Sequence, residues 1–178
     1  MPQQVHKIAV IGPESSGKTT LARRLAEYLH TLWLPEYARE YVENLQRPYT
    51  YADVEHIARR QPELERTCQR RANGLLFLDT ELIITKVWFD EVFGTRPPWF
   101  DELLRQYHGD FYLLCRPDLG WTYDPVREYP SQDFRDYLFG VYQRELEALG
   151  FPYAIIEGEG DTRFKRSIEY VEAFRQHL

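Results

Sequence analysis

Cysteine is scarce in this sequence, since Cys68 and Cys115 are the only two among 178 residues. Two cysteines are too few for a disulfide framework, and their separation is not a metal-ligand spacing. The sequence therefore excludes a disulfide-stapled secreted domain and a cysteine-based zinc site. We expect both side chains to be reduced thiols, which is typical of a cytoplasmic protein.

Long apolar runs and an excess of positive charge are also missing. No stretch approaches the ~20 apolar residues that a membrane-spanning helix needs, and the mean hydropathy is -0.55. The first residues lack the charged region, apolar stretch and cleavage site of a signal peptide, so we expect none. A net charge of -6 disfavours binding to a phosphate backbone, which needs a basic surface. We therefore expect neither nucleic acid nor a membrane as a partner.

What the sequence does contain is an alternation of short apolar runs with longer helical patterns. The apolar runs that predict buried strands are residues 7–11, 32–34, 74–79, 111–115 and 153–156. Strands separated by helices pair in parallel, with helices on both faces of the sheet. Pro62 should divide or kink the third helix, and Asp161 should cap the last one. We expect one α/β domain over residues 1–178.

A glycine-rich turn follows the first apolar run. Gly12 to Thr19, GPESSGKT, matches the pattern G-x-x-x-x-G-K-[ST] between an expected strand and an expected helix, which is the context that confirms this motif. Glycines let backbone N–H groups surround a phosphate chain, and the helix N-terminus adds a favourable partial charge. Lys18 can reach the β- and γ-phosphates, and the Thr19 hydroxyl can ligate Mg²⁺.

The motif therefore predicts a P-loop NTPase fold that binds ATP with Mg²⁺. The alternative is a chance glycine turn with a surface lysine. The residues expected to contact the nucleotide are Gly12, Glu14, Ser15, Ser16, Gly17, Lys18, Thr19 and Thr20.

Two carboxylates follow expected strands and should lie beside this turn. Asp79 ends a strand at the edge of the sheet where ligands bind, so we expect it to hold Mg²⁺ and to approach the substrate. Alternatively, Asp79 caps the helix that follows. Glu36 comes after the second strand, where its carboxylate can accept a proton from a substrate hydroxyl. Alternatively, Glu36 caps the dipole of the next helix, while Arg39 and Glu40 form surface ion pairs.

An irregular segment, residues 116–130, holds three prolines together with arginines and aromatic residues. Small-molecule kinases need a mobile lid that excludes water and brings cations to the transferring phosphoryl group. We expect Arg116 and Arg127 to supply these cations, and Trp121 and Asp124 to contact the substrate. The alternative is an ordinary solvent loop whose aromatic side chains fold back on the core.

Taken together, the motifs resemble the nicotinamide riboside kinase domain of the bifunctional bacterial NAD-salvage enzymes. The matching stretches are GPESSGKTTL, PEYARE, FLDT and DTRF, together with the spacing of Trp121, Asp124 and Arg127. The similarity runs from the first strand to residue 164. It implies ATP-dependent phosphorylation of the ribosyl 5′-hydroxyl, which yields nicotinamide mononucleotide.

The substrate that the resemblance implies carries a cationic pyridinium ring, which aromatic faces and acidic residues attract. For this reason we place Tyr37 on the substrate side. Arg39, which follows Glu36 at helical spacing, is also expected on the substrate side, and Arg163 is expected on the nucleotide side. The sequence departs from the family at one point. The family often shows D-T-D after the third strand, where this chain ends the triplet with Glu81, whose longer side chain can alter metal or substrate contacts.

Two other functions stay open at this point. One is a kinase for another nucleoside or a small alcohol, which would use Glu36 and the arginines in the same way. The other is a nucleotide-dependent switch or ATPase module that binds a protein partner. The sequence also leaves open whether ATP or GTP is the donor and whether the chain forms a homo-oligomer.

Overall fold

The computed structural model of the chain describes residues 4–120 and 131–178. Five strands in these ranges form one sheet: β1 (His6–Ile11), β2 (Leu32–Leu34), β3 (Leu75–Asp79), β4 (Phe111–Cys115) and β5 (Tyr153–Ile156). They lie in the order β2-β3-β1-β4-β5, and every neighbouring pair is parallel. The expected parallel sheet is confirmed, with the strand that precedes the glycine-rich turn at its centre.

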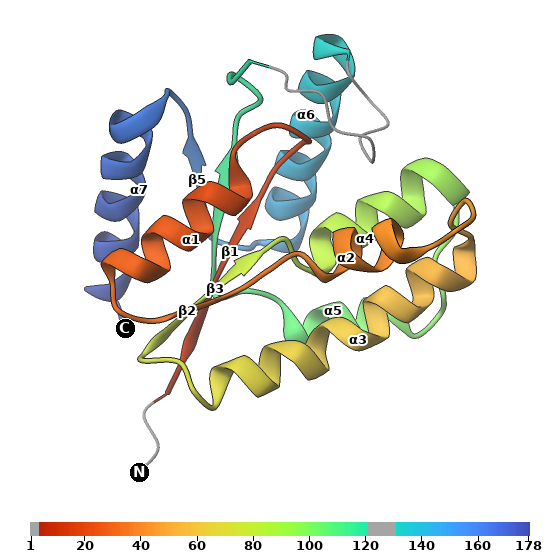
Figure 1. The fold of residues 1–178 in the computed structure, drawn as a ribbon, viewed down its shortest axis with the longest axis horizontal. Coiled ribbons are helices and arrows are strands. Elements are labelled where there is room, and N and C mark those ends of the chain that lie inside the picture. Colours follow the sequence, from red (N-terminus) through yellow and green to blue (C-terminus); the bar gives the residue numbers. More distant parts are fainter. Residues whose placement is uncertain (1–3, 121–130) are drawn as a thin grey trace.

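Helices connect the strands and cover both faces of the sheet, as expected (Figure 1). Their bounds are α1 (Lys18–Tyr28), α2 (Tyr37–Asn44), α3 (Tyr51–Gln69), α4 (Leu82–Trp88), α5 (Phe100–Tyr107), α6 (Gln132–Leu149) and α7 (Gly160–Arg175). A π-helical segment, η1 (Phe89–Phe93), continues α4. Figure 1 shows α1 and α7 on one side of the sheet and α3 to α6 on the other. No helix within the described ranges combines the length and the apolar character needed to cross a membrane.

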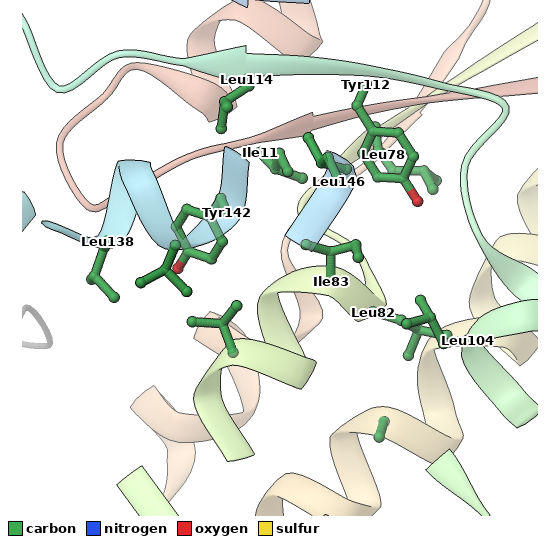
Figure 2. Packing of buried hydrophobic residues seen from close by; sticks show 14 of the residues in the cluster. Ile11, Leu78, Leu82, Ile83, Leu104, Tyr112, Leu114, Leu138, Tyr142 and Leu146 are labelled. Carbon is green, nitrogen blue, oxygen red and sulfur yellow. The ribbon is translucent and has the colours of Figure 1, made fainter. Parts of the chain in front are cut away.

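Alternate residues of the central strand contribute to two separate apolar clusters. Ile8 and Val10 pack against α1 and α7, whereas Ala9 and Ile11 belong to the cluster that α3 to α6 complete. This division follows from the strand geometry, because successive side chains point to opposite faces. Figure 2 shows part of the second cluster, including Ile11, Leu78, Leu82, Ile83, Leu104, Leu114, Leu138, Tyr142 and Leu146.

Two details of the helices bear on the expectations. Pro62 does not divide α3, which runs as a single helix of 19 residues, whereas the kink stays a prediction. A proline removes one backbone hydrogen bond of a helix, but the buried face of α3 continues on both sides of it. Helix α7 begins at Gly160 with Glu159 at the N-cap, so Asp161 is not the cap. Its carboxylate instead accepts a hydrogen bond of 2.9 Å from Arg24 on α1.

Candidate active site

The turn between β1 and α1 is a compact loop at the carboxyl end of the central strand. Gly12 and Gly17 have φ angles of +146° and +77°, which residues with a Cβ rarely adopt. A Cβ at Gly12 would lie 2.5 Å from the carbonyl oxygen of Cys115, so strand β4 leaves room for glycine alone. Because α1 begins at Lys18, the free N–H groups of its first turn add to the loop. The backbone therefore has the form of an anion cradle.

Side chains of this phosphate loop, residues 12–19, bind its own backbone and the end of β3. Ser16 Oγ donates a hydrogen bond of 2.7 Å to the carbonyl oxygen of Pro13, and Lys18 Nζ donates one of 2.8 Å to the same oxygen. Thr19 Oγ1 donates to Asp79 Oδ2 at 2.6 Å. The structure thus brings together the two residues that were expected to hold Mg²⁺.

The carboxylate of Asp79 is suited to bind a cation that prefers oxygen ligands. Its Oδ1 atom is buried and has no hydrogen-bond partner among the described residues. Burial raises the pKa of Asp79, and this is opposed by the hydrogen bond from Thr19 and by the charge of Lys18. A buried carboxylate oxygen beside a hydroxyl suits Mg²⁺, which takes few protein ligands together with water and phosphate oxygens. The described ranges hold no cluster of three acidic, histidine or cysteine side chains that could bind a metal by itself.

The residue at the N-cap of α4 is Glu81, so Asp79 does not cap that helix. Glu81 is 2% exposed, and its carboxylate lies in the interior instead of lining the cavity described below. Burial raises the pKa of Glu81 to about 7, while the nearby Tyr112 hydroxyl lowers it. The longer side chain that distinguishes this chain from the D-T-D pattern therefore lies near Tyr112 and does not line the cavity.

Glu36 lies at the start of α2. It occupies the N-cap position and makes no capping hydrogen bond with its side chain, so the alternative that its charge interacts with the helix dipole stays open. Burial raises the pKa of Glu36 to about 7; the charge of Lys18 lowers it, and the charge of Asp79 raises it. A carboxylate with a pKa near neutrality can take a proton from a hydroxyl and release it again.

A cavity of about 320 Å³ is lined by the phosphate loop, by the start of α2 and by apolar residues from several helices. The expected site residues in its lining are Gly12, Glu14, Ser15, Ser16, Gly17, Lys18, Thr19, Thr20, Glu36 and Arg39. Lining residues that were not expected include Val42, Tyr49, Ile84, Val87, Trp88, Glu91, Phe134, Leu138 and Tyr142. We call Tyr49, Trp88, Phe134 and Tyr142 the aromatic wall.

The aromatic wall contains a ring–ring contact and a buried tyrosine. The rings of Tyr49 and Trp88 meet edge to face, with their centroids 4.8 Å apart. Tyr142 is 6% exposed, and burial together with the charge of Glu36 raises the pKa of its hydroxyl, which therefore stays protonated at neutral pH. Phe134 and Tyr142 are eight residues apart on α6 and so lie on one face of that helix. The sequence could have shown this shared face, but it could not have shown whether the face borders the core or a cavity.

Two other expected substrate residues lie on α2. Arg39 lines the cavity, and its Nε atom donates to Glu43 Oε1 at 2.8 Å, so its surface ion pair is with Glu43. Tyr37 does not line the cavity, because its hydroxyl lies 3.0 Å from Nε2 of His56 on α3. The substrate contact of Arg39 stays a prediction, and nothing in the structure brings Tyr37 to the cavity.

The arginines expected around the nucleotide have protein partners. Arg116 forms an ion pair of 3.1 Å with Glu157, and its guanidinium lies 5.0 Å from the ring centre of Phe139. Arg163 is buried and binds the phosphate loop from the side of α7. Their catalytic and nucleotide contacts stay predictions. Three further expected residues, Trp121, Asp124 and Arg127, lie outside the described residues, as does most of the expected lid.

Comparison with known proteins gives a family and several relatives. The sequence model of the AAA domain matches residues 7–163. The trifunctional NAD biosynthesis/regulator protein NadR of Escherichia coli (strain K12) is 29% identical over 175 residues, a match that covers 96% of this chain and 43% of that protein. The chain thus spans less than half the length of this curated relative.

Two solved structures of NadR proteins share the fold. A NadR protein in complex with NR (nicotinamide riboside) has a TM-score of 0.82 and 27% identity, over 95% of this chain and 51% of that chain. A second, in complex with NAD and AMP-PNP, has a TM-score of 0.76 and 24% identity, over 95% of this chain and 49% of that chain. The shared fold therefore extends over nearly the whole chain.

Proposed function

The chain belongs to the AAA domain family, and from that premise we propose that it transfers the γ-phosphoryl group of ATP to the 5′-hydroxyl of nicotinamide riboside. The product would be nicotinamide mononucleotide. One observation carries the proposal: a single cavity is lined by the phosphate loop, by Glu36 and by the aromatic wall. The similarity to NadR, an NAD biosynthesis protein that was solved with NR, supports this acceptor.

The aromatic wall suits a cationic ring. Faces of Trp and Tyr attract cations that lie over them, at about 0.5–2 kcal/mol. Glu91 adds a carboxylate to the lining, and this group accepts hydrogen bonds of 3.1 and 3.2 Å from the Tyr137 hydroxyl. A neutral nucleobase would make the apolar contacts but would lack the charge attraction to Glu91 and to the faces of the aromatic rings. The lining therefore favours the pyridinium ring of nicotinamide riboside.

The phosphate loop prepares ATP for transfer. Its N–H groups bind the phosphate oxygens, and the Lys18 ammonium exchanges the Pro13 carbonyl oxygen for the β- and γ-phosphates. Mg²⁺, when held by Thr19, Asp79 and the phosphates, supplies positive charge that offsets the charge of the triphosphate. Lys18 lowers the barrier because it stabilises charge that grows on the phosphate oxygens as the bond breaks.

Glu36 handles the proton of the acceptor. As the 5′-oxygen forms its bond to the γ-phosphorus, the bond to the β,γ-bridging oxygen breaks and ADP leaves. The hydroxyl proton passes to the carboxylate of Glu36. A pKa of about 7 suits this step, because Glu36 is then ionised in a large fraction of molecules and is still basic enough to hold the proton.

The proposal is tested with the full chain, ATP and Mg²⁺ against a panel of nucleosides, with products read by mass spectrometry. The panel contains nicotinamide riboside, nicotinic acid riboside, thymidine, deoxyadenosine and uridine. We expect phosphorylation with the highest kcat/KM for nicotinamide riboside. A Glu36→Gln protein purified in the same way controls for contaminating kinases. ATP hydrolysis without transfer, or a higher kcat/KM for another nucleoside, would overturn the proposal.

A further inference from the structure

Arg163 is buried at the nucleotide side of the sheet, with 6% of its side chain exposed. Its Nη2 atom donates to the carbonyl oxygens of Ser16 at 2.8 Å and Arg116 at 3.1 Å. Its Nη1 atom donates to Asp118 Oδ1 at 2.7 Å and to the carbonyl oxygen of Gly158 at 2.8 Å. These partners belong to three segments that are far apart in the sequence, namely those that follow β1, β4 and β5.

The segments after β4 and β5 also bind each other through Asp118. Its second carboxylate oxygen accepts a hydrogen bond of 2.7 Å from the backbone N–H of Gly158. Hydrogen bonds between ionised partners are about twice as strong as neutral ones. Arg163 and Asp118 therefore hold the phosphate loop against the loops that follow β4 and β5. The guanidinium is engaged by protein groups and has little surface left for a ligand.

The contact with Ser16 determines how one peptide group of the phosphate loop is turned. Peptide bonds are planar, and none of the described ones is cis, so the C=O of Ser16 and the N–H of Gly17 point in opposite directions. Arg163 holds the oxygen and does not line the cavity, whereas Ser16 and Gly17 do. The N–H of Gly17 is therefore turned away from Arg163, and Gly17 itself lines the cavity. The φ of +77° at Gly17 permits this orientation.

We propose that Arg163 is a positioning residue, which keeps the N–H of Gly17 directed at the phosphate chain by holding the carbonyl oxygen of Ser16. It acts through the backbone and touches neither the nucleotide nor the acceptor. This role differs from the direct nucleotide contact that the sequence suggested. The inference rests on the nucleotide-binding part of the proposed function and is independent of which acceptor is phosphorylated.

The test compares the affinities of Arg163→Lys and the unchanged protein for ADP and for adenosine, by displacement of a fluorescent nucleotide. Lysine keeps the charge but lacks the fork that reaches Ser16 and Asp118 together. We expect the ADP affinity to fall by roughly 10- to 100-fold, as for the loss of a hydrogen bond to a charged group. The adenosine affinity should not change, because adenosine has no phosphates. In kinetics, the KM for ATP should rise while the KM for the acceptor is retained.

A matched control is Arg166→Lys, one turn further along α7. Arg166 is exposed and pairs with Glu157 at 3.2 Å, so both affinities should stay as they are in the unchanged protein. A merely structural role for Arg163 would weaken ADP and adenosine binding together, in step with the folded fraction measured by circular dichroism. That result, or an unchanged ADP affinity, would overturn the inference.

A second variant covers the case in which Arg163→Lys does not fold. Asp118→Asn keeps the size of the side chain but removes the charge that orients Arg163, and Asp118 is 31% exposed, which makes this change mild. We expect weaker ADP binding with unchanged adenosine binding, and equal ADP affinity in the folded variant would contradict the inference. Since the titrations contain no acceptor, failure of nicotinamide riboside phosphorylation leaves their outcome unaffected.

Discussion

A carboxyl group with a pKa of about 7 divides its population evenly between two charge states at neutral pH, and Glu36 is such a group. In the proposed reaction only the ionised form accepts the proton. The value of kcat/KM, measured with both substrates below saturation, should therefore rise with pH and level off above about 7. Measurements between pH 5.5 and 9 in a constant-ionic-strength buffer give this profile.

Replacing Glu36 should lower the rate and remove its dependence on pH. Glu36→Gln keeps the size and hydrogen-bonding capacity but has no charge to accept a proton. We expect kcat to fall by about two to four orders of magnitude, in the range of acid–base groups, and the rise toward neutral pH to disappear. If kcat were retained and only the melting temperature changed, Glu36 would be a structural residue of α2.

Two glutamates with a raised pKa should make the protein less stable as the pH rises. Glu36 and Glu81 both have a pKa of about 7 when folded, above the ordinary value of 4.5. The folded state thus binds more protons than the unfolded state between about pH 4.5 and 7, so their contribution to stability is present below 4.5 and lost as the pH approaches 7.

Glu81→Gln tests this linkage without touching the cavity. The variant should be more stable than the unchanged protein at pH 8, and the difference should shrink toward pH 4.5, because a protonated glutamate and a glutamine are alike in charge. Urea unfolding at both pH values measures the difference. A pH-independent difference would mean that packing, and not charge, governs position 81. Because Glu81 does not line the cavity, kcat should be retained.

Asp79 is expected to act through a cation. Asp79→Asn keeps the hydrogen bond from Thr19 within reach but removes the negative charge next to it. The Mg²⁺ concentration needed for the half-maximal rate should rise, since carboxylates bind Mg²⁺ better than amides do. Titrating Mg²⁺ at a fixed ATP concentration measures this shift. If the titration curve were unchanged, Asp79 would only hold Thr19 in place and would not bind Mg²⁺.

Between elements, a buried ion pair joins the central strand to two helices. Lys7 of β1 donates to Glu65 of α3 at 2.8 Å and to the carbonyl oxygen of Tyr107, at the end of α5, at 2.6 Å. Lys7 is 8% exposed and Glu65 is 1% exposed. Lys7→Met would leave the Glu65 carboxylate buried without its cation, which should cost about 3–5 kcal/mol of unfolding free energy at pH 8.

The double variant Lys7→Met/Glu65→Leu is the control for this pair. It removes both charges and replaces them with apolar side chains, so most of the lost stability should return. Burial already raises the pKa of Glu65, and the penalty of Lys7→Met should therefore shrink at acid pH, where the carboxyl binds a proton. Urea titrations of the three proteins measure these values. If Lys7→Met were as stable as the unchanged protein, water would have to reach the Glu65 carboxylate.

The elements and the phosphate loop were predictable because their patterns are local. A strand that is buried on both faces is a continuous apolar run, and the loop is a contiguous motif of eight residues. The aromatic wall was not predictable in the same way. The apolar stripe of a helix shows which face is covered, but it does not show whether Tyr142 or Trp88 faces the core or a cavity.

The partners of Arg163 could not be predicted either. Its contacts with Asp118 and Ser16 span 45 and 147 positions of the sequence. They depend on how α7 packs beside the phosphate loop, which no local pattern encodes. The sequence did indicate that Arg163 belongs near the nucleotide, but the direction in which its guanidinium points is a property of the assembled fold.

For the molecule as a whole, ligands of the cavity should stabilise the entire fold, because the phosphate loop continues the central strand. ADP with Mg²⁺ at 100 times its dissociation constant would add about 2.7 kcal/mol by mass action. For a chain of this length that corresponds to a rise in melting temperature of about 5–10 °C. Differential scanning calorimetry measures the rise, and Lys18→Ala should show a smaller one. No rise at millimolar ADP would contradict nucleotide binding.

The central position of β1 has a consequence for how the chain emerges from the ribosome. β1 ends at Ile11, and its two neighbours begin only at Leu75 and Phe111, so its apolar side chains leave the exit tunnel long before either partner exists. At about 5–20 residues per second, the 100 positions up to β4 take roughly 5–20 s to translate. During that time β1 is an unpaired apolar segment, open to chaperones and to other nascent chains. The strand that carries the phosphate loop is therefore made first and is enclosed on both edges only after four of the five strands have been synthesised.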